Sequence, residues 1–155
     1  MKSRLRPASG FAIRPATQGD VEQIVALDTL LTSVPKPDYW REQFASHGRR
    51  RSNFFLVASD AENKLLGVII GEVRAWEFGE PPCGWVFVLE VDPGERLKGI
   101  GTALFAALCE CFRKAKVTKI RTMLARSDQP LIMSFFRSQG LMAGPFIELE
   151  KDLDE

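Results

Sequence analysis

The sequence has 155 residues, of which 21 are lysine or arginine and 20 are aspartate or glutamate, and its formal net charge is +1 at pH 7. A chain of this length predicts one domain with a substantial hydrophobic core. The balanced charge provides no overall field to attract nucleic acid, and no apolar run approaches the ~20 residues that span a bilayer. We therefore expect neither nucleic acid nor a membrane as a partner.

Cysteine and histidine usage limits the kinds of site that the chain offers. Three cysteines and no secretory signal-peptide pattern favour a reducing environment, so we expect a cytoplasmic protein. Cys109 and Cys111 are two residues apart in an expected helix and point in different directions. His47 is the only histidine, so neither a Ser-His-Asp triad nor a metal site is expected.

The first half of the chain predicts a strand, two helices and a hairpin. We interpret the basic residues 1–10 as a flexible N-terminal arm and residues 11–155 as a single domain. Gly67 and Gly71 lie inside an expected strand and permit either close backbone approach or a bend. In chain order, the expected elements are a strand at 11–16, a helix capped by Asp20, a helix at 39–46 capped by Asp38, and strands at 54–59 and 65–76.

The second half of the chain has a different pattern, in which strands alternate with helices. A strand, a glycine-rich loop, a helix and a second strand form a crossover, which makes the two strands parallel. The expected elements are a strand at 86–91, a helix at 101–115, a strand at 119–125, a helix at 131–139 and a closing strand at 146–149. The whole order predicts a mixed α/β fold with one sheet, mostly antiparallel with one central parallel strand pair, and helices on both faces.

A basic, glycine-rich loop follows the strand at 86–91. Amide groups at a helix start have no partner within the helix, and the helix dipole adds partial positive charge there. Glycines remove the Cβ atoms that keep a ligand away, and basic side chains add full charges. The loop predicts a phosphate or diphosphate site, with a solvated turn as the alternative. Its residues are Arg96, Leu97, Lys98, Gly99, Ile100 and Gly101, and the helix follows from Thr102.

Two common nucleotide-binding motifs do not fit this loop. A P-loop has Lys-Ser/Thr where Ile100-Gly101 stands here, and a dinucleotide fingerprint has a third glycine where Leu104 stands. The remaining pattern is Val91-Asp92-Pro93 followed by Arg96-x-x-Gly99-x-Gly101. This pattern resembles the acyl-CoA loop of the GNAT superfamily of N-acetyltransferases.

The resemblance implies a GNAT-like fold over about residues 11–153, with acetyl-CoA as co-substrate. It implies that the loop from Arg96 to Thr102 holds the CoA diphosphate through its amides. It also implies that Leu89 and Val91 of the preceding strand align the pantetheine arm, and that a backbone N–H there polarises the thioester carbonyl. A homodimer is a common outcome in this family and is a possible state of this chain.

A second family-like pattern lies near the C-terminus. In the family's Asn-x-x-Ala-x-x-Leu/Phe-Tyr pattern, Gln129 stands for the asparagine, Ile132 for the alanine and Phe136 for the tyrosine. The resemblance implies CoA contacts for Gln129 and Phe136. The family tyrosine is often the acid that reprotonates the departing CoA thiolate, and phenylalanine cannot donate a proton. That role is therefore vacant, filled by water or moved elsewhere.

Transfer to an amine also requires a base, because a primary amine is mostly protonated at pH 7. Glu90 is the first candidate, since it lies among apolar residues on the strand that carries the loop. Strand alternation places its side chain opposite those of its neighbours, and a bulge near Leu89 is one way to redirect it. A structural ion pair with Arg74 or Arg121 is the alternative. Glu72, on the preceding strand, is the second candidate base.

The acceptor site is less defined by the sequence. In GNAT proteins the first two helices border this site, so Tyr39, Trp40 and Phe44 are candidates for substrate contact, with packing on the sheet expected for two of them. The expected function is transfer of an acetyl group from acetyl-CoA to a primary amine of a small molecule or a peptide, by direct attack in a ternary complex. A non-catalytic acetyl-CoA-binding or sensing domain is the alternative, and a structural module is the third possibility.

Overall fold

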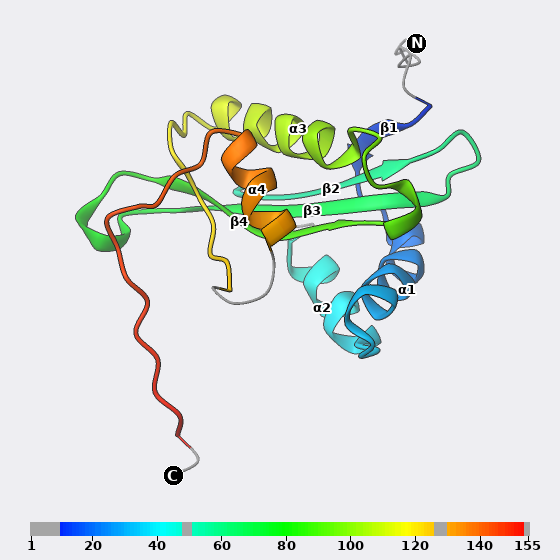
Figure 1. Ribbon diagram of the computed structural model, residues 1–155, viewed down its shortest axis with the longest axis horizontal. Helices are drawn as coiled ribbons and strands as arrows, with labels where there is room; N and C mark the ends of the chain where they lie inside the picture. The colour runs from blue at the N-terminus through cyan, green and yellow to red at the C-terminus, as the bar shows by residue number, and fades with distance from the viewer. Residues whose placement is uncertain (1–9, 48–50, 126–129, 154–155) are drawn as a thin grey trace. The chain divides into compact units, whose positions relative to one another are not determined.

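The computed structural model describes residues 10–47, 51–125 and 130–153 (Figure 1). The chain divides into two compact units, Met1–Met123 and Leu124–Glu155. The first unit contains the sheet, the glycine-rich loop and both candidate glutamates, and the second contains helix α4 (Pro130–Ser138). The arm expected at 1–10 lies, except for Gly10, outside the described residues.

Five strands form the sheet of the first unit, in the order β1-β2-β3-β4-β5. The pairs from β1 to β4 are antiparallel, and β4 pairs with β5 in parallel. This topology confirms the mixed sheet with one parallel strand pair, which helix α3 (Ile100–Lys114) connects. The strands are β1 (Ala12–Pro15), β2 (Asn53–Ser59), β3 (Leu65–Arg74), β4 (Cys83–Val91) and β5 (Ile120–Arg121).

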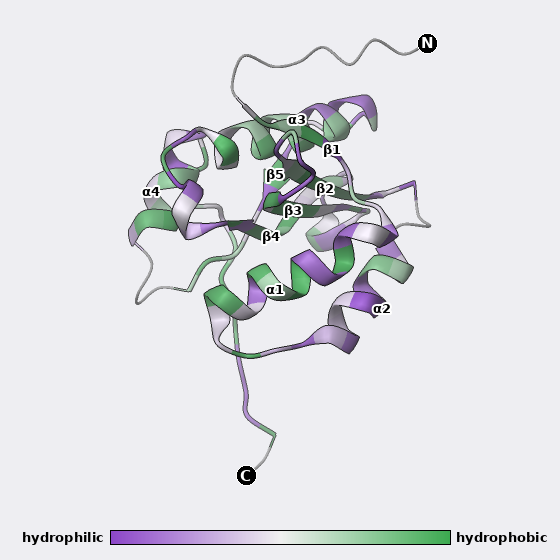
Figure 2. Cartoon of the chain, turned by 90° about the vertical axis from the view of Figure 1, so that its right-hand side faces the viewer, coloured by the Kyte–Doolittle hydropathy of each residue, from purple (hydrophilic) through white to green (hydrophobic). Residues whose placement is uncertain are grey.

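Helices cover both faces of this sheet. Figures 1 and 2 show α1 (Val21–Thr32) and α2 (Pro37–His47) on one face and α3 on the other. The apolar residues of α1 recur at three- and four-residue intervals, which places them on one side of the helix. That side faces the sheet, because burial of an apolar stripe is the main source of stability for a surface helix.

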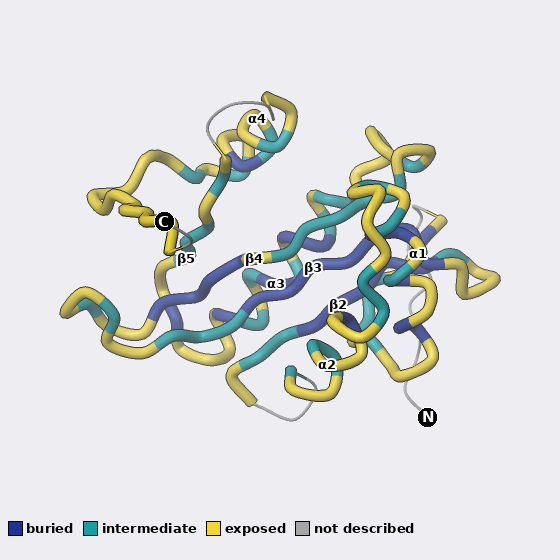
Figure 3. The backbone as a smooth tube through the Cα atoms, turned by 90° about the horizontal axis from the view of Figure 1, so that it is seen from below, coloured by how far each residue is buried: buried dark blue, intermediate teal, exposed yellow. Residues whose placement is uncertain are grey.

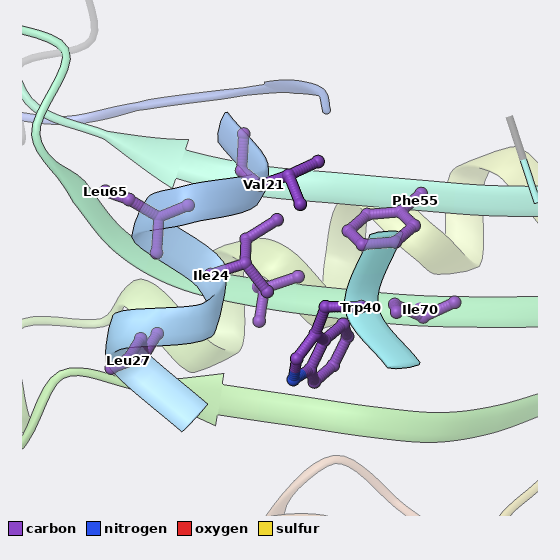
Figure 4. Packing of buried hydrophobic residues seen from close by; sticks show 9 residues of the cluster. Val21, Ile24, Leu27, Trp40, Phe55, Leu65 and Ile70 are labelled. Atoms are coloured by element: carbon purple, nitrogen blue, oxygen red, sulfur yellow. The ribbon is translucent and has the colours of Figure 1, made fainter. Parts of the chain in front are cut away.

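The core under α1 and α2 combines side chains from the helices with alternate side chains from the strands (Figure 4). Figure 3 shows the same concentration of burial along the strands. Each fully buried side chain of this kind contributes about 1.5–3 kcal/mol of hydrophobic stabilisation. The buried members are Val21, Ile24, Leu27, Trp40, Phe55, Val57, Leu65, Val68 and Ile70.

Glycines on the opposite face allow α3 to approach the sheet closely. A Cβ atom at Gly71 would lie 2.9 Å from the ring of Phe112, and one at Gly67 would lie 3.1 Å from a methyl group of Leu104. A Cβ at Gly84 would lie 2.7 Å from Phe112. Of the two alternatives for Gly67 and Gly71, the structure shows close approach, and the partner is α3.

A bulge interrupts the pairing of β3 with β4. Ile70 pairs with Val88 and Gly71 pairs with Val86, so Phe87 is the extra residue. The bulge was expected near Leu89, and the structure places it before that residue. Because Phe87 lies between Trp85 and Leu89, the bulge separates the part of β4 that pairs with β5 from the part that leads to the loop.

Two strand predictions need correction. The strand expected at 119–125 is only the two-residue β5, because at the next position the hydroxyl of Thr122, rather than a backbone amide, donates to the carbonyl oxygen of Val86 at 2.8 Å. The closing strand expected at 146–149 is wrong, since these residues form no strand. An apolar segment forms a strand only where backbone partners exist, and Pro145 just before this segment has no N–H to donate.

The predicted cap of α1 also needs correction. Asp20 is the last residue of a short 3-10 turn, η1 (Gln18–Asp20), and its side chain does not cap α1. Its Oδ2 instead accepts hydrogen bonds from the amide of Thr17 at 2.7 Å and from the Thr17 hydroxyl at 2.9 Å. Arg14 completes this arrangement with two further hydrogen bonds to the same carboxylate.

Candidate active site

The turn after β4 prepares the start of α3. The side chain of Asp92 accepts a hydrogen bond from the amide of Gly94 at 2.8 Å, and the 3-10 turn η3 (Pro93–Glu95) follows. Helix α3 begins at Ile100, and Gly99 precedes it with a φ of 81°. This left-handed conformation strains any residue that carries a Cβ atom, which explains the glycine at this position.

The first amides of α3 are open to a ligand. Helix geometry leaves them without a partner inside the helix. Among the described groups, none accepts a hydrogen bond from the amides of Ile100, Gly101 or Thr102. A Cβ atom at Gly99 would meet no atom within 4 Å, so the space in front of this backbone is free. The geometry therefore fits an anion that binds to several amides at once.

Basic side chains lie beside these amides. Arg96 and Lys98 are both exposed, and Lys98 forms an ion pair with Glu95 at 2.6 Å. Leu97, between them, has a φ of 65° and a fully exposed side chain. Because the partial charge of a helix start is weak, two nearby cations add substantially to the attraction for a phosphate group. The residues present fit a diphosphate.

The end of β4 offers a free edge in the described part of the chain. β5 pairs only with Gly84 and Trp85, so residues 87–91 have β3 on one side and no described strand on the other. Unpaired backbone groups at such an edge bind extended ligands by strand-like hydrogen bonds. Leu89 and Val91, both half-buried, lie on this edge.

Glu90 lies on the face that α1 and α2 cover. It pairs with Val68, whose side chain belongs to the core on that face, and opposed residues point to the same side of a sheet. Its Oε2 is buried and has no hydrogen-bond partner among the described groups. Burial, followed by the charge of Asp28 and a hydrogen bond to it, raises the pKa of Glu90 to about 7, whereas the charge of Lys36 lowers that pKa. A carboxyl group of this kind exchanges protons near neutral pH.

Asp28 of α1, beside Glu90, was not predicted as a site residue. Its side chain is buried and accepts a hydrogen bond from Nε1 of Trp40 at 2.9 Å. Nζ of Lys36 lies 3.1 Å from the same carboxylate oxygen. Two donors therefore hold a carboxylate that burial would otherwise destabilise.

A signal for Asp28 was present in the sequence. It follows Ile24 by four positions and Val21 by seven, so it falls on the apolar stripe of its helix. A charged residue on such a stripe is rarely buried without a partner. Its donors Trp40 and Lys36 lie within twelve positions of it, whereas Glu90 lies on β4, and no local pattern connects Asp28 with Glu90.

Glu72 occupies a different part of the same face. It forms an ion pair with Arg74 at 2.6 Å, and Nε2 of His47 lies 3.9 Å from its other oxygen. It pairs across the sheet with Trp85. Trp85 and Glu90 are five residues apart on β4, which corresponds to roughly 15 Å. The structure therefore does not bring the two glutamates together.

The two arginines considered as ion-pair partners for Glu90 pair with other carboxylates. Arg74 pairs with Glu72, and Nη2 of Arg121 lies 3.1 Å from an oxygen of Glu80. Since Asp28 and Lys36 are the charged groups beside Glu90 instead, the environment of Glu90 raises its affinity for a proton rather than stabilising its charge.

The three aromatic residues of α2 divide as expected. Trp40 is buried and Phe44 packs against the core, and both rings contact that of Phe55. Tyr39 is exposed, with its ring 5.2 Å from that of Trp40. Packing on the sheet therefore accounts for two of the three, and Tyr39 stays available to a ligand.

The second unit contains the remaining predicted residue that the structure describes. Phe136, on α4, is buried, and its ring lies 5.3 Å from that of Phe135. Gln129 lies outside the described residues. Across the described ranges, no helix has the length and apolarity of a bilayer-spanning segment. In those same ranges, no three histidine, cysteine, aspartate or glutamate residues are grouped as metal ligands.

Comparison with solved structures shows the same fold in proteins of low identity. A transcriptional regulator from Bacillus halodurans C-125 is 18% identical with a TM-score of 0.79, over 92% of this chain and 99% of that one. The aminoglycoside 6'-N-acetyltransferase AAC(6')-Ih from Acinetobacter baumannii is 17% identical with a TM-score of 0.78, over 93% and 99%. The aminoglycoside N-acetyltransferase AAC(6')-Iy, in complex with CoA, is 13% identical with a TM-score of 0.81, over 92% and 95%.

Sequence comparison identifies the family. No curated protein sequence matches this chain. The acetyltransferase (GNAT) family, however, matches residues 21–141, which include α1, β4, the glycine-rich loop and α3. Because this match covers most of the sequence, the chain belongs to the acetyltransferase (GNAT) family.

Proposed function

We propose that this protein transfers an acetyl group from acetyl-CoA to a primary amine of a small molecule or a peptide, by direct attack in a ternary complex. Membership of the GNAT family supports acetyl-CoA as the co-substrate. The observation that carries the proposal is the presence of two features on the same strand, β4. Glu90, with a pKa raised to about 7, lies on the strand that ends in an open, basic loop.

The loop and the strand edge are the residues that fit the coenzyme. In this proposal, the amides from Leu97 to Thr102 bind the diphosphate, and Arg96 and Lys98 neutralise its charge. The free edge of β4 at Leu89 and Val91 binds the pantetheine arm through backbone hydrogen bonds. Contacts from Gln129 and Phe136 stay predictions.

Glu90 acts as the base. Acetyl-CoA supplies the acetyl group as a thioester, and an amine attacks only after it has lost a proton. A base is most effective when its pKa is close to the working pH, which is the case for a carboxyl group whose pKa is about 7. A backbone N–H of β4 polarises the carbonyl group, an effect that contributes ~3 kcal/mol in comparable sites.

Phenylalanine at position 136 weakens the case for this mechanism but does not exclude it. It leaves the departing thiolate without the acid that the family tyrosine often provides. A thiol has a reference pKa of ~8.5, so its thiolate leaves readily and takes a proton from water. Proton removal from the amine and polarisation of the carbonyl are therefore the steps that need the protein most.

The structural neighbours suggest where the search for an acceptor should begin. Two of them are named aminoglycoside acetyltransferases, whose acceptors are polar small molecules with several amines. We therefore place amino sugars first in an acceptor panel, followed by polyamines and by peptides with a free N-terminus or lysine.

The experiment measures thiol release from acetyl-CoA with this panel, and acetyl-CoA affinity by calorimetry. We expect turnover with at least one amine. Gly99→Ala is expected to weaken acetyl-CoA binding about tenfold or more, because the new methyl group occupies the space that the diphosphate needs.

Gly79→Ala is the matched control for that variant. Gly79 also has a positive φ, 71°, and its added Cβ atom would also meet nothing within 4 Å. The two variants therefore carry similar backbone strain, and only Gly99→Ala alters the loop. Equal acetyl-CoA affinities in the two variants would contradict the proposed role of the loop.

A non-catalytic acetyl-CoA-binding domain is the second candidate function. Phe136 favours it, because this residue removes a proton donor that many catalytic relatives use. This candidate predicts tight acetyl-CoA binding, sensitivity to Gly99→Ala, and no thiol release with any amine. One acceptor with turnover that depends on Glu90 would exclude it.

A further inference from the structure

We propose that Asp28 is a positioning residue for Glu90: as a fixed acceptor it orients the Glu90 carboxyl group and favours the protonated form of Glu90, and the charge of Lys36 opposes the second effect. The catalytic meaning of this arrangement rests on the proposed function. The contact between the two carboxyl groups, however, belongs to the folded protein and can be measured without any substrate.

The position of Asp28 is fixed by two different segments. Its side chain is only 3% exposed, although it carries a charge. Trp40 of α2 donates to Oδ2 at 2.9 Å, and Lys36, in the connection between α1 and α2, donates to Oδ1 at 3.2 Å. Because Trp40 is itself part of the core, the indole group is a rigid donor and leaves Asp28 little freedom.

The contact with Glu90 joins α1 to β4. Glu90 lies opposite Val68, on the sheet face that α1 covers, and its Oε2 is buried without a hydrogen-bond partner among the described groups. In its protonated form, Glu90 donates a hydrogen bond to Asp28. The charge of Asp28 and this hydrogen bond both favour the protonated form of Glu90. Trp40 and Lys36 hold Asp28 in the position in which it accepts this hydrogen bond.

Lys36 has the opposite effect on the same proton. Its ammonium group lies 3.1 Å from Asp28 and attracts the charge that forms when Glu90 ionises. Asp28 and Lys36 are the charged groups that act on Glu90 from the elements packed against it within the described residues. A carboxylate on one side and an ammonium group on the other thus set the pH at which Glu90 releases its proton.

Two substitutions with opposite expected effects test this arrangement. Asp28→Asn removes the like charge and replaces it with a side chain that can still pack and accept a hydrogen bond. It is expected to lower the pKa of Glu90 by about one unit. Lys36→Met removes the positive charge, keeps the length of the side chain, and is expected to raise that pKa by about half a unit. An altered fold alone does not produce shifts of opposite sign.

The measurement is a carboxyl 13C NMR titration of the full chain without acetyl-CoA, with the Glu90 signal assigned by its loss in Glu90→Gln. A Glu90 titration that is the same in Asp28→Asn, Lys36→Met and the parent protein would overturn the inference. If Asp28→Asn does not fold, Lys36→Met alone decides, because its shift has a predicted sign.

Activity provides a separate readout. The acidic limb of the kcat/KM profile for the best amine is expected to move with the titration, down in Asp28→Asn and up in Lys36→Met. Shifted titrations without thiol release from any amine would refute the proposed function and leave the contact intact. Thiol release with an amine, together with a Glu90 titration that is the same in all variants, would support the proposed function and refute the positioning role of Asp28.

Discussion

Asp20 and Glu90 are both carboxyl groups at the face that α1 covers, and the structure moves their pKa values in opposite directions. Two hydrogen bonds from Arg14 at 2.7 and 2.8 Å, with two more from Thr17, lower the pKa of Asp20 to about 2. Burial, and then Asp28, raise the pKa of Glu90 to about 7. Desolvation opposes the charge in both places, so the partners decide the outcome.

The difference separates a structural site from the proposed reactive site. At the start of α1, both carboxylate oxygens of Asp20 accept hydrogen bonds, which stabilises the charged form of Asp20 and joins β1 to η1. At β4, Glu90 has a second carboxylate as its neighbour and an oxygen without a hydrogen-bond partner among the described groups. A carboxyl group whose surroundings do not stabilise its charge is a candidate for proton transfer.

The largest expected effect is on catalysis. Glu90→Gln should lower kcat/KM for the best amine by about 100-fold or more, because general base catalysis contributes effects of this size. Asp20→Asn should leave kcat/KM unchanged at a temperature where it is folded, since Asp20 belongs to the structural site. Thiol-release kinetics measure both. Equal losses in the two variants would mean that the contrast between the two carboxyl groups has no catalytic meaning.

The second effect is on stability and concerns the same two regions. Asp20→Asn should lower the free energy of unfolding by about 2 kcal/mol, because it leaves the partly buried Arg14 without its charged partner. Urea denaturation gives this value. Glu22→Gln is the control, since Glu22 pairs with Arg41 at 3.0 Å between exposed side chains. It should change stability by less than about 0.5 kcal/mol, and a similar change in both variants would contradict the comparison.

The smallest effect is a pH dependence of opposite sign. The native pKa of Glu90, about 7, exceeds its ordinary value of 4.5, so its contribution to stability is complete below pH 4.5 and is lost as the pH rises through 7. Asp20 contributes above its ordinary value of 3.8, and this contribution is lost as the pH falls towards 2.

Unfolding measured at pH 5 and pH 8 isolates the contribution of Glu90. As the pH rises from 5 to 8, the free energy of unfolding of Glu90→Gln should increase by about 1 kcal/mol relative to that of the parent protein, after allowance for solvent screening. The gain appears because glutamine does not have to ionise in a buried position. A difference between variant and parent that stays constant from pH 5 to pH 8 would contradict the raised pKa of Glu90.

Local patterns predicted most of the fold and the loop. The strands β2, β3 and β4, helices α1 to α4 and the glycine-rich start of α3 follow from apolar spacing and from glycines within one segment. The predictions that failed depend on distant partners. Residues 146–149 are mostly apolar but form no strand, and β5 stops after Arg121, where Thr122 bonds through its side chain.

The same limit applies to the candidate site. Glu90 is the first candidate because a carboxylate among apolar neighbours is costly to bury unless it has a partner or a function. A few residues of sequence are enough for this argument. The alternative role for Glu90 was an ion pair with Arg74 or Arg121, whereas the charged groups that act on it in the structure are Asp28 and Lys36. Charge attraction along the strands suggested arginines, but the helix that packs across β4 supplied a carboxylate.

The sequence by itself determined the order of the elements, the open amides at the start of α3 and the identity of the candidate base, because each depends on residues that are neighbours in the chain. Only the tertiary structure decided the proton affinity of that base. It brings Asp28 of α1 beside Glu90 of β4, 62 positions later by the numbering of the sequence. Desolvation and charge act through space, so a pKa depends on what packs against a residue and not on what precedes it.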